Sequence, residues 1–98
     1  MKPEQITETL EQAAAQLGVH VRYETMTGEV AGAGGLCKLK GQWCVIIDRK
    51  VTPAERAATL TEALAQLDTD AVFLPPEIRD ALAAARAART PSAAAPAS

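Results

Sequence analysis

Cys37 and Cys44 are the side chains best suited to nucleophilic or metal-binding chemistry, and they flank a predicted hairpin turn. A two-residue turn at Lys40 and Gly41 would pair Cys37 with Cys44, whereas a three-residue turn would place Cys37 opposite Trp43. A zinc site would need two more ligands, and none lies nearby in the sequence. We therefore expect no metal here, and we favour two buried, reduced cysteines that pack as small apolar side chains.

His20 is the only histidine in the chain, and it falls in a separate predicted strand. That strand could lie beside the hairpin, so a Cys–His nucleophilic pair with Cys44 or Cys37 is one interpretation. Asp48 and Glu24 are then the acidic residues available to orient the imidazole. The sequence singles out neither of them. Instead of a catalytic pair, we favour the interpretation that His20 simply faces solvent from its strand.

A glycine-rich segment runs from Gly28 to Gly35 and invites comparison with phosphate-binding loops. Such a loop aims successive backbone N–H groups at the phosphates, typically at the N-terminus of a helix. Here the glycines lead into a predicted strand, no Gly-Lys-Ser/Thr follows, and Glu29 would repel an anion. We expect the segment to be a connecting loop over residues 25–35.

Length and composition exclude several classes of protein. The chain has 98 residues, which allows one domain, and 21 of them are alanine, so few large side chains remain for a core. A net charge of −2 argues against the basic surface that nucleic-acid binding requires. No apolar run is long enough to span a membrane, and two cysteines are too few for a disulfide scaffold. We therefore expect a cytoplasmic protein with no membrane partner and no cofactor.

Periodicity predicts the elements that must position these residues. Apolar residues at helical spacing predict helices over 3–17, 53–67 and 76–89, and alternating ones predict strands over 19–24, 36–39 and 42–48. Thr52, Pro53 and Glu55 form a capping box that begins the second helix. The strand over 42–48 is apolar on both faces, which is typical of a central strand or of one covered by helices on both sides.

These elements predict an α+β fold: an N-terminal helix, three short, mainly antiparallel strands including a hairpin, and then two helices. The domain should cover residues 1–89. The apolar linker over 71–74 is expected to lie against the core. Residues 90–98 contain no large apolar side chain, which predicts a disordered tail.

One stretch resembles a known family. Cys44-Val-Ile-Ile-Asp48, a short loop and the helix over 55–67 are similar to the core of the ImmA/IrrE-type metallopeptidases. That family carries a hydrophobic strand, an Arg-containing lead-in and a helix that begins around "TLAHELGHLL". The resemblance runs over roughly residues 4 to 68, because the preceding helix, strand, glycine-containing loop and hairpin also fit.

The chain departs from this family where the chemistry would be. In the family, two histidines one turn apart bind zinc, and the glutamate between them activates a water molecule. Thr61 and Ala65 occupy the two histidine positions here, and only Glu62 matches, at the general-base position. The resemblance therefore implies a relative that lacks the zinc ligands, a candidate pseudoenzyme.

Helical geometry adds a candidate binding surface. Glu62 lies on the opposite face of its helix from Leu60, and Ala58, Thr61 and Ala65 share its side. A partner could pack there, or the third helix could, or these could simply be surface alanines. Glu62 is also a catalytic candidate, together with His20 and Cys44.

These observations favour a small non-enzymatic domain that acts by binding another protein or a second copy of itself. One alternative is a Cys/His-dependent enzyme. Another is a regulatory domain linked to a DNA-binding partner, which is suggested only by the company that metallopeptidases of this type keep.

Overall fold

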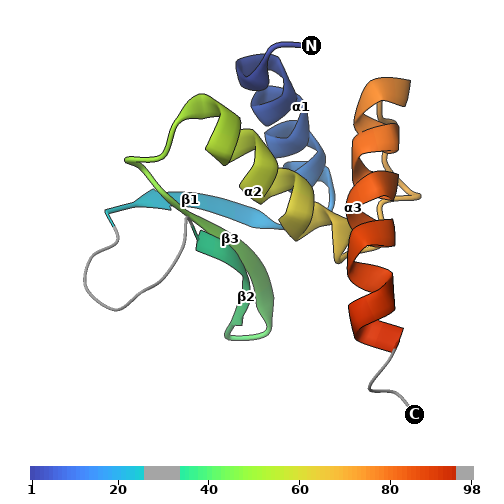
Figure 1. Cartoon of the computed structure of the whole chain (residues 1–98). Coiled ribbons are helices and arrows are strands. Elements are labelled where there is room, and N and C mark those ends of the chain that lie inside the picture. The colour runs from blue at the N-terminus through green and yellow to red at the C-terminus, as the bar shows by residue number, and fades with distance from the viewer. Residues whose placement is uncertain (26–33, 95–98) are drawn as a thin grey trace.

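The computed structural model describes residues 1–25 and 34–94, and this part contains three helices and three strands (Figure 1). The elements follow one another as α1 (Pro3–Gln16), β1 (His20–Glu24), β2 (Gly34–Leu39), β3 (Gln42–Asp48), α2 (Pro53–Ala65) and α3 (Pro76–Ala94). The predicted α+β class is confirmed.

Local signals in the sequence set the start of α2. The Thr52 hydroxyl accepts a hydrogen bond from the Glu55 N–H at 3.1 Å, and the Glu55 carboxylate accepts one from the Thr52 N–H at 2.9 Å. These two bonds are the reciprocal capping box predicted from the sequence, with Pro53 at the first helical position. The helix ends at Ala65, slightly before the expected end at residue 67.

The hairpin between β2 and β3 has the two-residue turn. Lys40 and Gly41 both have positive φ, at 52° and 78°, as a type I′ turn requires. Cys37 therefore pairs with Cys44, and Lys38 pairs with Trp43. Strand β2 begins at Gly34, so the expected connecting loop extended too far at that end; residues 26–33 lie outside the described part of the chain.

The sheet is mixed, which corrects the expectation of mainly antiparallel strands. Its order is β1-β3-β2, with β1 parallel to β3 and β2 antiparallel to β3. Strand β2 runs opposite to β1, and the hairpin reverses the chain again, so β3 lies beside β1 in the same direction. Of the two interpretations of a strand that is apolar on both faces, the structure shows the central position.

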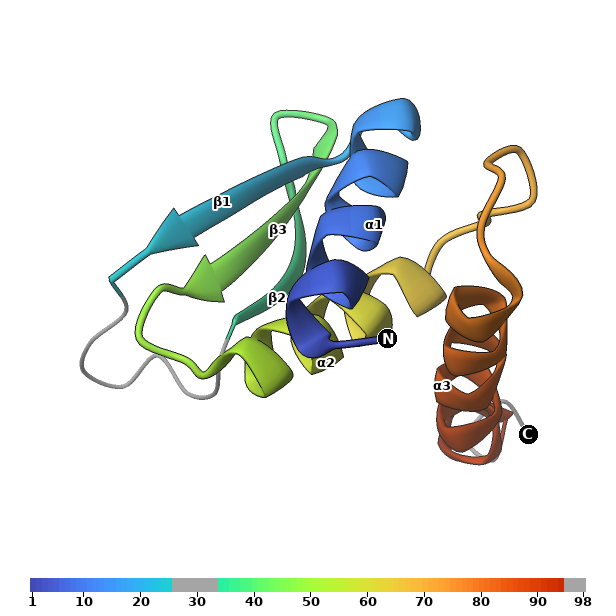
Figure 2. The ribbon, with the colours of Figure 1, turned by 90° about the horizontal axis from the view of Figure 1, so that it is seen from above.

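The helices form a second layer on one face of the sheet (Figure 2). Helices α1 and α2 lie against the strands, and α3 packs against α2. Within residues 1–25 and 34–94, no helix covers the other face. The apolar residues on both faces of β3 therefore reflect its central place rather than helices on both sides.

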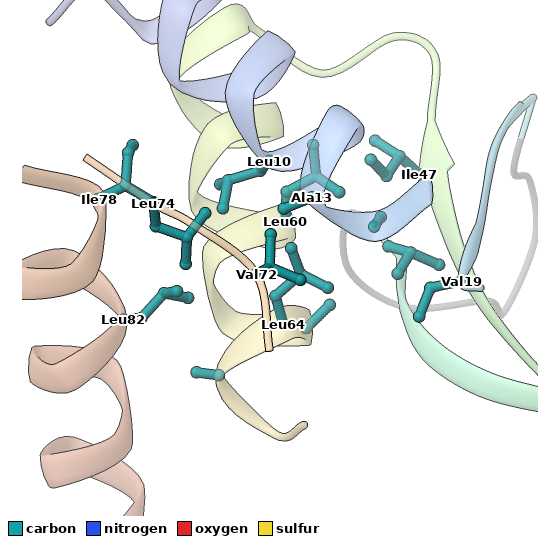
Figure 3. Close-up of a cluster of buried hydrophobic side chains, with 14 residues drawn as sticks. Leu10, Ala13, Val19, Ile47, Leu60, Leu64, Val72, Leu74, Ile78 and Leu82 are labelled. Atoms are coloured by element: carbon teal, nitrogen blue, oxygen red, sulfur yellow. The ribbon is translucent and has the colours of Figure 1, made fainter. Parts of the chain in front are cut away.

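The core lies where α1, α2 and the sheet meet, and the linker before α3 closes it (Figure 3). Val72 and Leu74 of that linker are buried, which confirms its expected position, while Phe73 between them points outward and is 89% exposed. The largest fully buried side chains are Leu10, Val45, Ile47, Leu60, Leu64, Ile78 and Leu82. Alanines fill the remaining core positions on the helices, at Ala13, Ala14, Ala57, Ala63 and Ala65.

Helix α3 continues to Ala94, beyond the expected end at residue 89. The segment expected to be disordered therefore begins later than residue 90, although Thr90, Pro91 and Ser92 are poor helix formers. For residues 95–98, outside the described part of the chain, the disordered tail stays a prediction. Among the described residues, no helix is both long and apolar enough to cross a membrane.

The two faces of α2 should respond differently to substitution. Leu64 is fully buried, so Leu64→Ala should lower the free energy of unfolding by about 2–5 kcal/mol. Glu62 is exposed on the same helix, and Glu62→Gln should change the free energy of unfolding by about 1 kcal/mol or less. Chemical denaturation of both variants measures the difference, and equal losses would contradict the observed helix faces.

Candidate functional site

The four residues of the predicted binding surface divide between two sides of α2. Ala58 and Glu62 are exposed. Thr61 is half-buried, and its hydroxyl donates to the Ala57 carbonyl at 2.8 Å. Ala65 is only 6% exposed, and its carbonyl accepts a hydrogen bond from Arg86 of α3 at 3.0 Å. The third helix therefore packs at the Ala65 end, and the exposed part of the surface is Ala58 and Glu62.

A groove runs beside the exposed part of this surface, between α2 and the edge strand β2. It has a volume of about 320 Å³. Its walls are Gly35 and Leu36 from β2 and Ala58, Thr59, Glu62, Ala63 and Gln66 from α2. We call this the β2–α2 groove. Apart from Glu62 and Gln66, its walls consist of small or apolar side chains and one threonine.

Glu62 brings a free negative charge to the β2–α2 groove. No ion pair to Glu62 occurs among the described residues, and Gln66 donates only to its backbone carbonyl, at 3.4 Å. The neighbouring Thr59 hydroxyl is engaged with the Glu55 carbonyl at 2.9 Å. A carboxylate in these surroundings can pair with a cation, but the described residues around the groove place no acid–base partner beside it.

The groove is bordered by an unpaired strand edge. Leu39 and Gln42 flank the two-residue turn and so form a hydrogen-bonded pair, and such pairs alternate along an antiparallel ladder. Cys37 is then hydrogen-bonded to β3, whereas Leu36 and Lys38 direct their backbone N–H and C=O groups away from it. No described strand lies beyond β2, so these groups form an open edge.

His20, Cys44 and Cys37 lie in one row across the other face of the sheet. His20 pairs with Cys44 in the parallel ladder, and Cys37 pairs with Cys44 in the antiparallel one. The structure thus brings together the histidine and the cysteines that the sequence left in separate elements. Cys44 is 6% exposed, and its thiol donates to the Gln42 carbonyl at 3.9 Å, so a substrate has little access to its sulfur.

The acidic residues considered as orienting groups lie elsewhere. Glu24 and Asp48 pair with each other at the far ends of β1 and β3. Four residues along a strand correspond to about 13 Å, so neither carboxylate reaches His20. Among the described residues, no group of three or more His, Cys, Asp or Glu side chains is arranged to hold a metal ion.

Sequence reasoning missed a polar cluster around Tyr23. The Tyr23 hydroxyl donates to the Glu11 carboxylate, and the Arg56 guanidinium lies 5.2 Å from the centre of the ring. Arg49 Nη2 donates to the Tyr23 carbonyl at 2.8 Å. The cluster links α1, β1 and α2, whose contributions are far apart in sequence. A helical pattern predicts only that Glu11 lies off the apolar stripe of α1. These contacts could therefore not be predicted from the local sequence.

A cavity of about 600 Å³ opens beside this cluster, between α1 and the start of α2. Carboxylates from α1 and two arginines share its lining, which consists of Glu4, Thr7, Glu8, Glu11, Tyr23, Arg49, Pro53 and Arg56. The Thr7 hydroxyl oxygen and Arg56 Nε are buried without a hydrogen-bond partner. Opposite charges face one another across this cavity, so it favours neither a simple anion nor a simple cation.

A scan against protein-family models, a search of curated proteins and a search of solved structures each gave no match to this chain. The geometry of the β2–α2 groove and the residues that line it are therefore the features that point to a function.

The Tyr23 cluster makes a prediction about pH. Burial raises the pKa of Tyr23 to about 12, and the hydrogen bond to the Glu11 carboxylate adds to this increase. An unfolded chain ionises tyrosine near 10, so the stabilisation from this proton is present below about pH 10 and is lost as pH rises toward 12. Tyr23 is the only tyrosine, so phenolate absorbance should report its titration directly.

Glu11→Gln is the matched variant for this titration. It keeps the shape of the side chain and removes the charge, so the pKa of Tyr23 should fall toward its ordinary value while the contribution of burial remains. A titration near 10 in the folded native chain, or no change in Glu11→Gln, would contradict the described contact.

Proposed function

We propose that this chain is a non-enzymatic protein-binding domain, and that it binds an extended segment of another protein as an added strand along β2. The observation that carries the proposal is the β2–α2 groove, where an open strand edge runs beside an exposed helix face. The backbone groups of Leu36 and Lys38 would supply the main-chain hydrogen bonds, as in other cases of strand addition.

The lining of the groove favours one kind of segment. Alternate side chains of an added strand would point toward α2, where Ala58, Thr59 and Ala63 leave room. Glu62 has no ion-pair partner among the described residues, so it would attract a cation. A lysine or arginine at an inward-facing position fits both features, because its apolar stem can cover Ala58 while its charge meets Glu62.

The resemblance to ImmA/IrrE-type metallopeptidases supports a binding role over a catalytic one. If the chain descends from that family, Glu62 is the remnant of the catalytic centre, and Thr61 and Ala65 stand where the zinc ligands were. Neither a threonine nor an alanine in these places supplies a zinc ligand of the usual kind. The groove would then have kept the shape for a peptide without the means to cleave it.

A Cys/His-dependent enzyme is the second candidate, and the pairing of His20 with Cys44 favours it. Two observations count against it: Cys44 is buried, and Glu24 and Asp48 lie at the opposite ends of their strands. Nothing in the described structure favours the third candidate, a link to a DNA-binding partner.

A random linear peptide library displayed on phage tests the strand-addition proposal. Lys38→Pro should weaken binding of the selected peptides about tenfold, because it removes one outward-facing N–H, on the scale of one hydrogen bond. Proline is tolerated there because that N–H does not bond to β3. Lys38→Ala is the matched control: it also removes the contact between Lys38 and Trp43 but keeps the N–H, and it should bind normally.

The same library tests the charge preference. Selected peptides should be enriched in lysine or arginine. The Glu62→Gln variant should bind these peptides several-fold more weakly than the native chain. Asp80→Asn makes the same change of charge at an exposed position on α3 and should have no effect. If no peptide is selected, or if the two Lys38 variants bind alike while circular dichroism shows both folded, strand addition at β2 is wrong.

Metal analysis provides an independent check on the non-enzymatic assignment. Protein purified without chelators should contain well below one equivalent of zinc, since Thr61 and Ala65 replace the histidines. Stoichiometric zinc that survives dialysis would contradict both the alignment with the peptidase motif and the proposed loss of catalysis.

A further inference from the structure

Cys37 and Cys44 face each other directly across the β2–β3 hairpin. They are register partners, so their side chains project from the same face of the sheet. Both are free thiols in this structure, and they are the only cysteines in the chain. Within the described residues, no helix lies over this face of the sheet.

From this register we propose that Cys37 and Cys44 are a redox-active pair that closes reversibly to a disulfide across the hairpin. A hydrogen-bonded antiparallel pair has its Cα atoms about 5.5 Å apart, which lies inside the range of about 4.4–6.8 Å found for disulfides. The Cα separation set by the register is therefore compatible with a disulfide. The proposal is independent of the proposed function.

The two thiols differ in access, which sets the order of events. Cys37 is half-buried and Cys44 is buried, so a small disulfide such as oxidised glutathione meets Cys37 first. The Cys37 thiolate attacks one sulfur of that molecule, its S–S bond breaks, and one glutathione thiolate leaves. The Cys44 thiolate then attacks Cys37 Sγ and releases the second glutathione.

In sum, the two protein thiols lose two electrons, and oxidised glutathione gains them. The two thiol protons end on the two molecules of reduced glutathione. The only co-reactant is the small disulfide.

The geometry also explains why the bond should be reversible. Directly opposed residues in a sheet have Cβ atoms about 4.5–5.5 Å apart, whereas a disulfide holds them at about 3.5–4.5 Å. Closing the bond therefore pulls the two strands slightly together. Strained or exposed disulfides have more oxidising potentials than structural ones and belong to the labile class.

The disulfide would leave the proposed binding edge intact. Cys37 points to the face of the sheet opposite the helices, whereas the open edge consists of the backbone of Leu36 and Lys38 on either side of it. Peptide binding and disulfide formation can therefore be measured separately, and failure of one does not imply failure of the other.

Intact mass spectrometry of the full chain in glutathione buffers tests the proposal. As the buffer becomes more oxidising, both free thiols should disappear together when samples are acid-quenched and then alkylated in denaturant, where Cys44 is accessible. The monomer mass should fall by that of two hydrogens. Returning the protein to reduced glutathione should restore both thiols.

Three variants serve as controls. Cys44→Ser should accumulate glutathione on Cys37, since the resolving thiol is missing, and Cys37→Ser should remain largely unmodified because Cys44 is buried. Cys44→Ser combined with Trp43→Cys moves the second thiol to the opposite face of β3, so the folded variant should not close. In denaturant, this double variant and the native chain should both close.

The proposal is overturned if the folded native chain keeps both thiols free in oxidised glutathione, or if it stops at a mixed disulfide on Cys37. It is also overturned if only disulfide-linked dimers form. Equal closure of the folded double variant and the native chain would show that proximity in sequence, rather than register across the hairpin, is responsible.

Discussion

Backbone pairing along both edges of β3 is the constraint on which the rest of the structure depends. Because side chains alternate along a strand, a slip of one residue would move every side chain of β3 to the opposite face. Val45 and Ile47 are fully buried under the helices, so burial of these two residues fixes the register. The same register then places Cys44 on the other face, between His20 and Cys37.

Buried alanines allow the helices of the core to pack closely against each other. Ala13, Ala14 and Ala63 are almost completely buried, and such small side chains allow two helix backbones to approach each other. Leu10, Leu60 and the other large residues of the core then fill the space that remains. A chain with few large apolar side chains can form a closed core in this way. Each buried leucine should therefore contribute a large share of the domain's free energy of unfolding.

Features that depend on neighbouring residues could be predicted from the sequence. The location of the turn at Lys40 and Gly41 is one, because Gly41 readily adopts the positive φ of a tight turn, although the sequence left two-residue and three-residue turns open. The start of α2 is another, because Thr52 and Glu55 satisfy each other's backbone groups three residues apart. The length of that turn then decides whether Cys37 lies opposite Cys44 or opposite Trp43.

Features that depend on distant residues could not be predicted. The parallel pairing of β1 with β3 joins segments separated by the whole of β2, and periodicity carries no signal for it. A helical wheel places Ala65 near Glu62, but it cannot show that α3 covers one of them. Arg86 makes that distinction, since its guanidinium binds the Ala65 and Leu67 carbonyls at 3.0 and 2.9 Å.

Helix α2 therefore has one side closed by α3 and another left open along β2, and the charge of Glu62 lies on the open side. An exposed carboxylate contributes little to folding, so Glu62 is not needed to hold the helix in place. Its energetic effect would appear when a strand occupies the groove and removes water from the carboxylate. A segment with a cation at that position compensates the charge, whereas an apolar or acidic segment leaves it unpaired. Selectivity in the groove would then come mainly from this penalty on unsuitable segments rather than from a strong attraction to the right one.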